Sequence, residues 1–412
     1  MNDPAYGLLA RMLLLFLPLP LLLTTLYLRS QYPFVQPALL PLIVLGTLHA
    51  LLYPPKAQAW VQYANGFLSV GYLVRAVELL LIRDVEQLRA LDRAARSSSY
   101  SWQPMPAALG WTRLRWMVDL VMNPRAIGWS HGSAKYHHPE RVRDRRLAFF
   151  RSQLLTLVTA YLVFDAHQTC FSRNYPRVCS TIATILETTW GVKGAPEISE
   201  NIVITYLFPI SCWLAVFSFM EAVRTLYSMV TVAILGTFSD LPSGEPWMYP
   251  GWFGSVTSLL RLNLKGIWGK MWHDLCRRPL LAISVSMTPR RWPAALKTFF
   301  IFYLSFIISG TFHAAGAYAT LQSTHSAAMM MAFFNVLPVF IALQQLCSEL
   351  LVPQLLPPGL LADGVAWSTD AVLMAVWTLW TCPWFTKYSA VPEIIASFPL
   401  PVSLWGLLGR YM

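Results

Sequence analysis

The feature that most restricts the fold of this sequence is a series of long apolar segments separated by charged stretches. A segment of about 17 to 25 apolar residues is long enough to cross a bilayer as a helix. Nine segments are candidates: 12–28, 35–53, 60–82, 148–166, 200–236, 298–320, 326–346, 365–386 and 391–408. We therefore predict one domain over residues 1–412. It is an all-α, polytopic bundle of about eight or nine transmembrane helices, with further helices at the membrane surface.

Charged residues are few and unevenly distributed. Lys, Arg, Asp and Glu make up 12% of the chain, against about 25% in a soluble protein. The formal net charge is +11, and basic residues concentrate in two stretches, 83–147 and 237–297. Because such stretches stay on the cytosolic side of a membrane, we expect both in the cytosol and the loop 167–199 in the lumen. This distribution also explains the positive charge without nucleic-acid binding.

The proposed topology constrains the segment 200–236. An odd number of crossings must lie between the lumenal loop and the second basic stretch, so this segment should be one long helix. Within the apolar segments, Arg75 and Glu78 lie three positions apart, as do Glu221 and Arg224. That spacing places both members of a pair on one helical face, where they can form an ion pair.

The six cysteines contain no CxxC pair, and we expect no metal site. Cys170 and Cys179 lie nine positions apart in the loop that we place in the lumen. In an oxidising compartment they are candidates for a disulfide bond.

The sixth apolar segment contains a histidine, His313, and no Lys, Arg, Asp or Glu. An ionisable side chain at membrane depth is costly and is often functional. Ser305 and Ser309 precede His313 at intervals of four, so the three share one helical face, and the serines can hydrogen-bond the imidazole. Gly310 and Gly316 allow neighbouring helices to approach closely. The segment alone is equally consistent with a functional histidine and with a structural one that bonds another helix.

The segment 266–279 is too basic for a membrane span and too aromatic for an ordinary loop. It predicts an amphipathic helix at the cytosolic interface. Its basic residues can meet a lipid head group or the phosphates of a nucleotide-bearing cofactor. Composition alone favours a membrane-surface helix without a catalytic part. The residues that stand out are Trp268, Trp272, His273, Asp274 and Arg277.

A third stretch, 113–129, mixes aromatic and charged residues in the same way. Trp116, Asp119, Arg125 and Trp129 lie within it. By itself this composition does not define a site.

Together these segments resemble the wax synthase-like branch of the membrane-bound O-acyltransferase superfamily. The resemblance rests on the run Trp-Gly-Lys-Met-Trp-His-Asp at 268–274, on Arg277, and on His313 inside an apolar helix forty residues after His273. The stretches 115–129 and 244–255 are also similar, so the likeness covers roughly 110–320. It is closest to the fungal members that acetylate terpenoids and meroterpenoids.

The resemblance implies roles for particular residues. The buried histidine that is catalytic in the family corresponds to His313, and the upstream polar residue corresponds to His273. Acetyl-CoA is then a co-substrate, with no tightly bound cofactor and no metal. Lys270 and Met271 depart from the arginine pair of the family, which leaves the phosphate contact there open. The residues expected to contact the substrates are Trp268, Trp272, Asp274, Arg277 and Ser309.

Acyl transfer to an alcohol suits these side chains. A neutral imidazole in an apolar site can remove the alcohol proton, because burial disfavours its charged form. His273 and Trp272 can supply hydrogen-bond donors for the oxyanion or position the thioester. An apolar bundle admits a lipophilic alcohol and excludes water, which would hydrolyse the acyl donor.

The sequence therefore predicts a multi-pass acetyltransferase of the endoplasmic reticulum that acts on a terpenoid-type secondary metabolite. Its partners are acyl-CoA, a lipophilic alcohol and the bilayer. One alternative is a wax ester synthase that acylates long-chain alcohols. Another is a transporter in which His313, Arg75 and Glu78 line a pathway. Transporters often contain internal repeats, and the chain has none, so the joint occurrence of the two motifs favours the enzyme.

Overall fold

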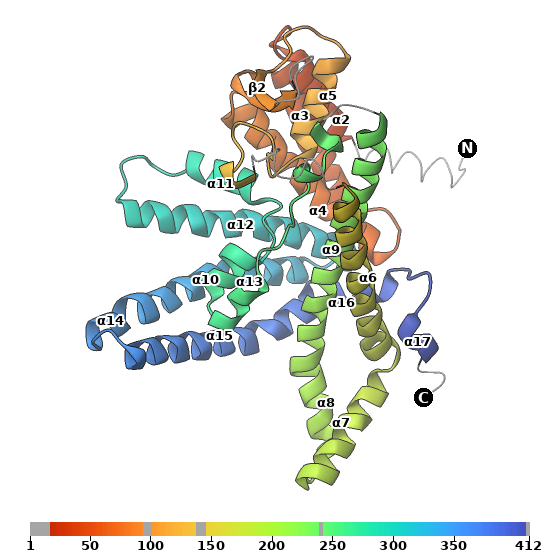
Figure 1. Cartoon of the computed structure of the whole chain (residues 1–412), viewed down its shortest axis with the longest axis vertical. Coiled ribbons are helices and arrows are strands. Elements are labelled where there is room, and N and C mark those ends of the chain that lie inside the picture. The colour runs from red at the N-terminus through yellow and green to blue at the C-terminus, as the bar shows by residue number, and fades with distance from the viewer. Residues whose placement is uncertain (1–16, 94–99, 137–145, 239–241, 409–412) are drawn as a thin grey trace.

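The computed structural model describes residues 17–93, 100–136, 146–238 and 242–408. The chain is almost entirely helical (Figure 1). Within the described residues, seven helices are long and apolar enough to cross a membrane. They are Val35–Leu52, Ala59–Ile82, Arg146–Phe171, Ala195–Leu235, Ala294–Leu321, Thr324–Leu355 and Leu360–Tyr388. A shorter apolar helix, α2 (Pro18–Leu28), precedes them. The predicted all-α polytopic bundle is confirmed.

The described residues form many helices and two strands. The first part of the chain contains α2, α3 (Val35–Leu52), α4 (Ala59–Ala76), β1 (Arg89–Arg93), β2 (Tyr100–Pro104) and α5 (Trp111–Met122). The middle contains α6 (Arg146–His167), α7 (Tyr175–Trp190), α8 (Ala195–Ile202) and α9 (Phe208–Phe238). The last part contains α10 (Leu264–Gly266), α11 (Arg277–Ser286), α12 (Ala294–Leu321), α13 (Thr324–Gln344), α14 (Val352–Leu355), α15 (Leu360–Tyr388), α16 (Val391–Ser397) and α17 (Leu404–Leu408).

Shorter helical turns connect or extend these elements. The π-helical segments are Val77–Ile82, Gln168–Arg173, Val203–Leu207, Ile267–Met271 and Gln345–Leu351. The 3₁₀ turns are Val85–Gln87, Ala134–Tyr136, Pro242–Gly244, Pro246–Met248 and Val256–Arg261.

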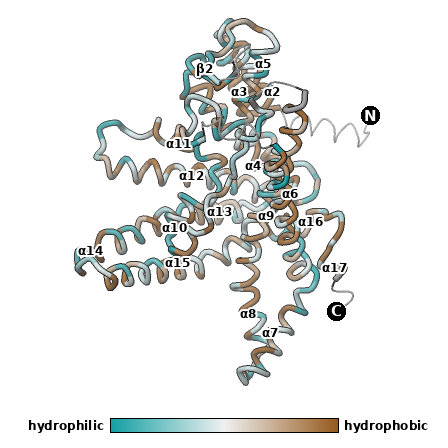
Figure 2. Tube along the Cα trace, viewed as in Figure 1, coloured by the Kyte–Doolittle hydropathy of each residue, from teal (hydrophilic) through white to brown (hydrophobic). Residues whose placement is uncertain are grey.

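The long helices form two groups that meet near the middle of the molecule. In Figure 1, α6, α7, α8 and α9 run along the longest axis, whereas α12, α13 and α15 extend to one side. The first helices, the β-hairpin and α5 lie at the upper end, opposite α7 and α8. Figure 2 shows apolar residues along α6, α9 and α13. Parts of the two predicted basic stretches contact each other, because Arg125 donates to the backbone carbonyls of Pro250 and Gly251.

Small residues allow close contact between α4, α12 and α13. A Cβ atom added at Gly310 of α12 would lie 2.9 Å from Cβ of Phe334 in α13. A Cβ atom at Gly66 of α4 would collide with the backbone carbonyl of Ala315 in α12. Glycine at these positions therefore lets the three helices pack backbone to side chain, as the sequence predicted for α12.

Both predicted ion pairs are present. Arg75 pairs with Glu78, which also accepts from Arg83 at 2.7 Å. Arg224 pairs with Glu221 at 2.7 Å. Both residues of the first pair are buried, and the Arg75 guanidinium also donates to the backbone carbonyl of Leu120 in α5. This pair therefore fixes α5 to the third span.

The segment 200–236 is one continuous helical crossing, as predicted, because α8, a π-helical turn and α9 follow without a break. The preceding loop is itself largely helical, since it contains α7. The predicted span at 391–408 is wrong. It consists of α16 and α17, separated by Pro399 and Pro401, which cannot continue a helix.

The predicted disulfide bond is also absent, because all six cysteines are described and all are free. Cys170 lies in the π-helical segment after α6, and Cys179 lies in α7. The two cysteines therefore lie in different helical elements, on either side of Asn174.

The β-hairpin was not predicted from the sequence. β1 and β2 pair in antiparallel register from Arg89 opposite Pro104 to Arg93 opposite Tyr100. The sequence of β1, Arg-Ala-Leu-Asp-Arg, lacks the alternation of apolar and polar residues that indicates a strand, and the alternation in β2 covers only Tyr100 to Gln103.

Candidate active site

A cavity of about 320 Å³ lies between the 268–281 segment, α12 and α13. It contains side chains that are separated by forty or more positions in the sequence. His313 and Ser309 come from α12, whereas His273, Trp268, Trp272 and Arg277 come from the segment before it. The structure thus brings six of the seven predicted site residues to one cavity. Asp274, the seventh, does not line it.

The imidazole of His313 is held on three sides. Its Nδ1 atom lies 2.8 Å from the hydroxyl oxygen of Tyr63, which belongs to α4. Its ring stacks on Phe334 at 4.6 Å between centroids and an angle of 13°. Phe67 packs edge-on against it at 5.4 Å. The hydrogen bond and the two aromatic contacts define one orientation of the imidazole.

A glycine of α12 makes room for the tyrosine that bonds His313. A Cβ atom added at Gly316 would lie 2.7 Å from the Tyr63 ring. The tyrosine therefore lies against a turn of α12 that has no side chain. Because Gly316 follows His313 by three positions, the same stretch of helix presents the imidazole and accommodates its partner.

The serines of the predicted stripe face the cavity but do not contact the imidazole. Ser305 donates to the carbonyl of Ile301 at 2.7 Å and lies 3.0 Å from the hydroxyl of Ser284 in α11. Ser309 lines the cavity wall near His313. Tyr63 takes the place that the sequence assigned to the serines as the partner of His313.

The segment 266–279 is not the single amphipathic helix that was predicted. Helical structure ends at Met271, Trp272 is extended with ψ of 154°, and α11 begins at Arg277. Two backbone hydrogen bonds stabilise this break in the helix. The amide of Gly254 donates to the carbonyl of Met271 at 2.8 Å, and the amide of Asp274 donates to the carbonyl of Trp252 at 3.0 Å. This strand-like pairing places His273 in the break and beside the cavity.

His273 is held in a partly apolar environment. Phe253 packs edge-on against its ring at 6.0 Å between centroids. Its Nδ1 atom is buried, and no described residue hydrogen-bonds it. Burial lowers the pKa of His273 to about 4, although the nearby Asp274 carboxylate raises it and Arg277 lowers it further. His273 is therefore largely neutral from about pH 5 upward.

This shift predicts how stability depends on pH. The unfolded chain protonates His273 near its ordinary pKa of 6.5, whereas the folded chain does so only near 4. Stability from this group is therefore complete above pH 6.5 and is lost as the pH falls towards 4. At pH 5 the loss is up to about 2 kcal/mol. Between pH 8 and pH 5, we expect the melting temperature of the His273→Gln variant to fall less than that of the wild type. A thermal-shift titration in detergent with an identical slope for both proteins would contradict the shift.

An aromatic cluster surrounds the two tryptophans. Trp272 lies 4.9 Å from Trp213 of α9 and 5.5 Å from Trp268, measured between ring centroids. Trp268 also contacts Phe334, whose ring stacks on His313. The tryptophans therefore connect the wall formed by α9 to the residues that hold the imidazole.

Asp274 and Arg277 diverge from the same break. The carboxylate of Asp274 pairs with Arg125 at 2.8 Å and accepts from the Tyr136 hydroxyl at 2.7 Å. It therefore anchors the first basic stretch. The guanidinium of Arg277 donates to the carbonyl of Gly269 at 2.6 Å, and its side chain is exposed at the cavity. Arg277 therefore places a cationic group at this cavity, whereas Asp274 does not line it.

Tyr63 was not predicted from the sequence. Its hydrogen bond to His313 joins residues 250 positions apart, and a tyrosine in an apolar span is ordinary. Tyr63 lies one helical turn before Gly66, and that glycine marks the close approach of α4 to α12.

The part of the chain that forms this cavity is similar in sequence to known proteins. A family described as "Membrane bound O-acyl transferase family" matches residues 249–336, which include both His273 and His313. Acetyltransferase eriL of Hericium erinaceus is 26% identical over 384 residues, covering 90% of each chain. Acetyltransferase AOL_s00215g273 of Arthrobotrys oligospora is 24% identical over 383 residues, covering 84% of this chain and 74% of the relative.

A third relative, O-Mevalon transferase yanI of Aspergillus niger, is 24% identical over 281 residues, covering 64% of this chain and 58% of the relative. No solved structure matches. The comparisons confirm the resemblance to the membrane-bound O-acyltransferases that the motifs at 268–277 and 313 indicated. The chain is an O-acyltransferase and a multi-pass membrane protein.

Proposed function

We propose that the protein transfers an acetyl group from acetyl-CoA to a hydroxyl group of a lipophilic, terpenoid-type metabolite. The observation that carries this proposal is the cavity that joins His313 to His273 and the two tryptophans. The names of the relatives support acetyl as the transferred group. The proposal places the reaction at His313, inside the part of the chain that matches the family.

In this mechanism His313 is the general base. When Nδ1 donates its proton to the Tyr63 oxygen, the lone pair on Nε2 is free to accept a proton. The acceptor hydroxyl gives its proton to Nε2 as its oxygen attacks the thioester carbonyl. The tetrahedral intermediate then expels the thiolate of coenzyme A, which recovers the proton from the imidazolium. The ester and the free thiol leave, and His313 is neutral again.

His273 and Trp272 support the second half of the proposal. A tetrahedral intermediate concentrates negative charge on the former carbonyl oxygen, and fixed donors lower its energy. A neutral His273 with a protonated ring nitrogen can donate one hydrogen bond to that oxygen. The Trp272 indole is the second donor that the break in the helix brings to the same wall.

The size of the cavity favours a short acyl group. Pockets for small ligands range from about 300 to 1,000 Å³, and this one, at about 320 Å³, is at the lower end. Phe302, Phe306 and Phe334 occupy much of its wall. An acetyl group and the hydroxyl-bearing end of an acceptor fit this description better than a long-chain acyl group together with a fatty alcohol.

The mouth of the cavity is proposed to face the cytosol, in the endoplasmic reticulum membrane. Arg277 and the exposed Lys270 lie in the basic stretch 237–297, which the positive-inside rule assigns to that side. These cations are suited to the phosphates of coenzyme A.

The proposal is tested with microsomes that contain the protein. They are incubated with labelled acetyl-CoA or palmitoyl-CoA and a panel of terpenoid and fatty alcohols. We expect an acetyl ester of at least one terpenoid alcohol. Palmitoyl transfer to fatty alcohols, without acetyl transfer, would favour the wax ester synthase instead.

Tyr63 provides a separate prediction. Tyr63→Phe keeps the ring packed against Gly316 but removes the hydroxyl that bonds Nδ1 of His313. The imidazole then loses its partner, and we expect turnover to fall about 10- to 100-fold, by analogy with outer partners that orient a functional histidine. The measurement is kcat and KM for the acetyl donor at matched expression. A normal kcat would show that Tyr63 does not orient the base.

A further inference from the structure

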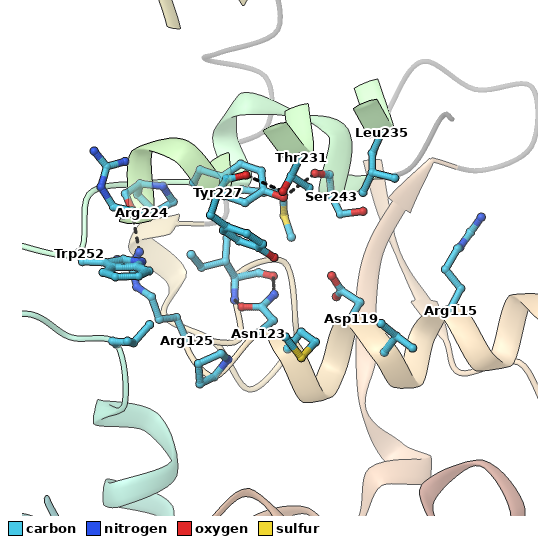
Figure 3. Close-up of a pocket in the computed structure, with 18 of the residues that line it drawn as sticks. Arg115, Asp119, Asn123, Arg125, Arg224, Tyr227, Thr231, Leu235, Ser243 and Trp252 are labelled. Carbon is cyan, nitrogen blue, oxygen red and sulfur yellow. Dashed lines mark hydrogen bonds between the residues drawn. The ribbon is translucent and has the colours of Figure 1, made fainter. Parts of the chain in front are cut away.

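A second cavity, with a volume of about 650 Å³, is twice as large as the one that holds His313 (Figure 3). It lies between α5, the last turns of α9 and the segment 243–252. It contains much of the aromatic and charged stretch 113–129, which the proposed reaction does not use. The sequence singled out this stretch without assigning it a role.

The two cavities lie on opposite sides of the segment 273–276. Leu275 and Trp252 line the larger cavity, whereas His273 and Cys276 line the smaller one. Arg125 lines the larger cavity and pairs with Asp274 at 2.8 Å. The larger cavity is therefore separated from His313 by the break that carries His273, and it is a distinct site.

The walls of the larger cavity are mostly apolar. The apolar residues that line it include Leu114, Val118, Met122, Leu235, Met248 and Leu275. Sites with such walls and a few polar groups bind largely apolar small molecules. The volume is within the usual range for a ligand of that kind.

Two of the three arginines that line the cavity are engaged in ion pairs. Arg125 is paired with Asp274, and Arg224 is paired with Glu221 at 2.7 Å. Arg115 precedes Asp119 by four positions on α5, and their opposite charges interact. A polyphosphate such as that of coenzyme A would meet arginines that are already engaged and the carboxyl group of Asp119. A neutral ligand is therefore favoured.

Asp119 is one of several polar residues that line this cavity. Figure 3 shows the Asp119 carboxyl group directed towards the wall that carries Thr231 and Ser243. Its Oδ2 atom accepts from the indole of Trp129 at 2.7 Å. Burial raises its pKa to about 6, even though the hydrogen bonds from Trp129 and Asn123 lower it. A carboxyl group that is protonated in part near neutral pH can both donate to and accept from a hydroxyl or carbonyl group.

We propose that this cavity is a second binding site, for a neutral, largely apolar molecule with a hydroxyl or carbonyl group that bonds Asp119. The apolar walls hold the body of the molecule, and the carboxyl group selects its oxygen. The site does not depend on which group the enzyme transfers at His313, because it is separated from that cavity by residues 273–276.

The site is tested by photolabelling the purified full chain in detergent, with no acyl donor present. The probe is a C15 isoprenoid alcohol that carries a diazirine group, and the labelled peptides are identified by mass spectrometry. We expect labelling of residues 111–127 or 243–252. Excess unlabelled alcohol should compete at least about tenfold better than the matching hydrocarbon or the matching diphosphate. A diphosphate that competes better than the alcohol would overturn the proposal, as would labelling restricted to 268–281 and 302–334.

Matched variants locate the probe. Val118 lines the cavity and is 40% exposed, so Val118→Trp fills the space without disturbing the core, and labelling should fall about tenfold. Thr112→Trp is the control, because Thr112 is exposed on the same helix and does not line the cavity. In the Asp119→Ala protein, the unlabelled alcohol should compete no better than the hydrocarbon. The side chain of Asp119→Asn can still accept the hydrogen bond from the Trp129 indole. Equal labelling of the Val118→Trp and Thr112→Trp proteins contradicts the site.

Discussion

Replacing His313 by alanine should lower acetyl transfer about 10²- to 10⁴-fold, the usual effect of losing a general base. The variant should still insert and accumulate, because the imidazole lines a cavity and its loss leaves the contacts of α12 at Gly310 and Gly316 in place. The rate is measured with labelled acetyl-CoA and an accepting alcohol, at equal amounts of protein determined by immunoblot. At that loss, little activity is measurable at normal expression.

Glutamine at the same position separates a base from a structural hydrogen bond. The amide of His313→Gln can still bond the Tyr63 hydroxyl, but it does not take up a proton near neutral pH. We therefore expect the glutamine variant to be as inactive as alanine and as stable as the wild type. A glutamine variant with a rate near that of the wild type would return His313 to a purely structural role.

His273→Ala should also reduce turnover strongly, because it removes a candidate donor to the oxyanion. Loss of one such donor lowers kcat about 10²- to 10³-fold. The fall should be in kcat, with little change in KM for acetyl-CoA, since the bond forms only as charge develops. His273→Gln is the matched variant, because its amide can donate to the same oxygen and should recover part of the rate.

The alternative for His273 is a role as part of a membrane-surface anchor. In that case the alanine variant would lose membrane association or accumulation, while activity per molecule remained normal. Separation of the microsomal and soluble fractions, combined with the rate per molecule, distinguishes the two roles. Normal turnover per molecule in the membrane fraction would rule out the proposed contact with the oxyanion.

How much of this could be predicted from the sequence varies with the range of the interaction. The long apolar helices were predictable because length and hydropathy are local properties. The segment 391–408 shows the limit of that approach, since its hydropathy suits a span while Pro399 and Pro401 interrupt the helix. Both prolines are visible in the sequence, and their effect on the helix outweighs the hydropathy of the segment.

The candidate site was predicted in part. The motif spacing identified His313 and His273, and the structure places both at one cavity. The break at residues 272–276 contains neither Gly nor Pro, so no local sequence signal predicts it. It forms because Trp252 and Gly254 offer backbone hydrogen bonds from another part of the chain. The same reason hides Tyr63, whose role depends on a contact between distant helices.

The contact between α4 and α12 has a consequence for how related enzymes can be recombined. The segment that matches the family begins at residue 249, yet the side chain that orients its histidine comes from Tyr63 in α4. In this contact α4 supplies Gly66 and Tyr63. The facing residues, Ala315 and Gly316, belong to α12. A chimera that exchanges only the C-terminal half between two relatives would join mismatched halves of this contact. The first spans and α12 should therefore be inherited as a pair, and natural recombination points should avoid separating them.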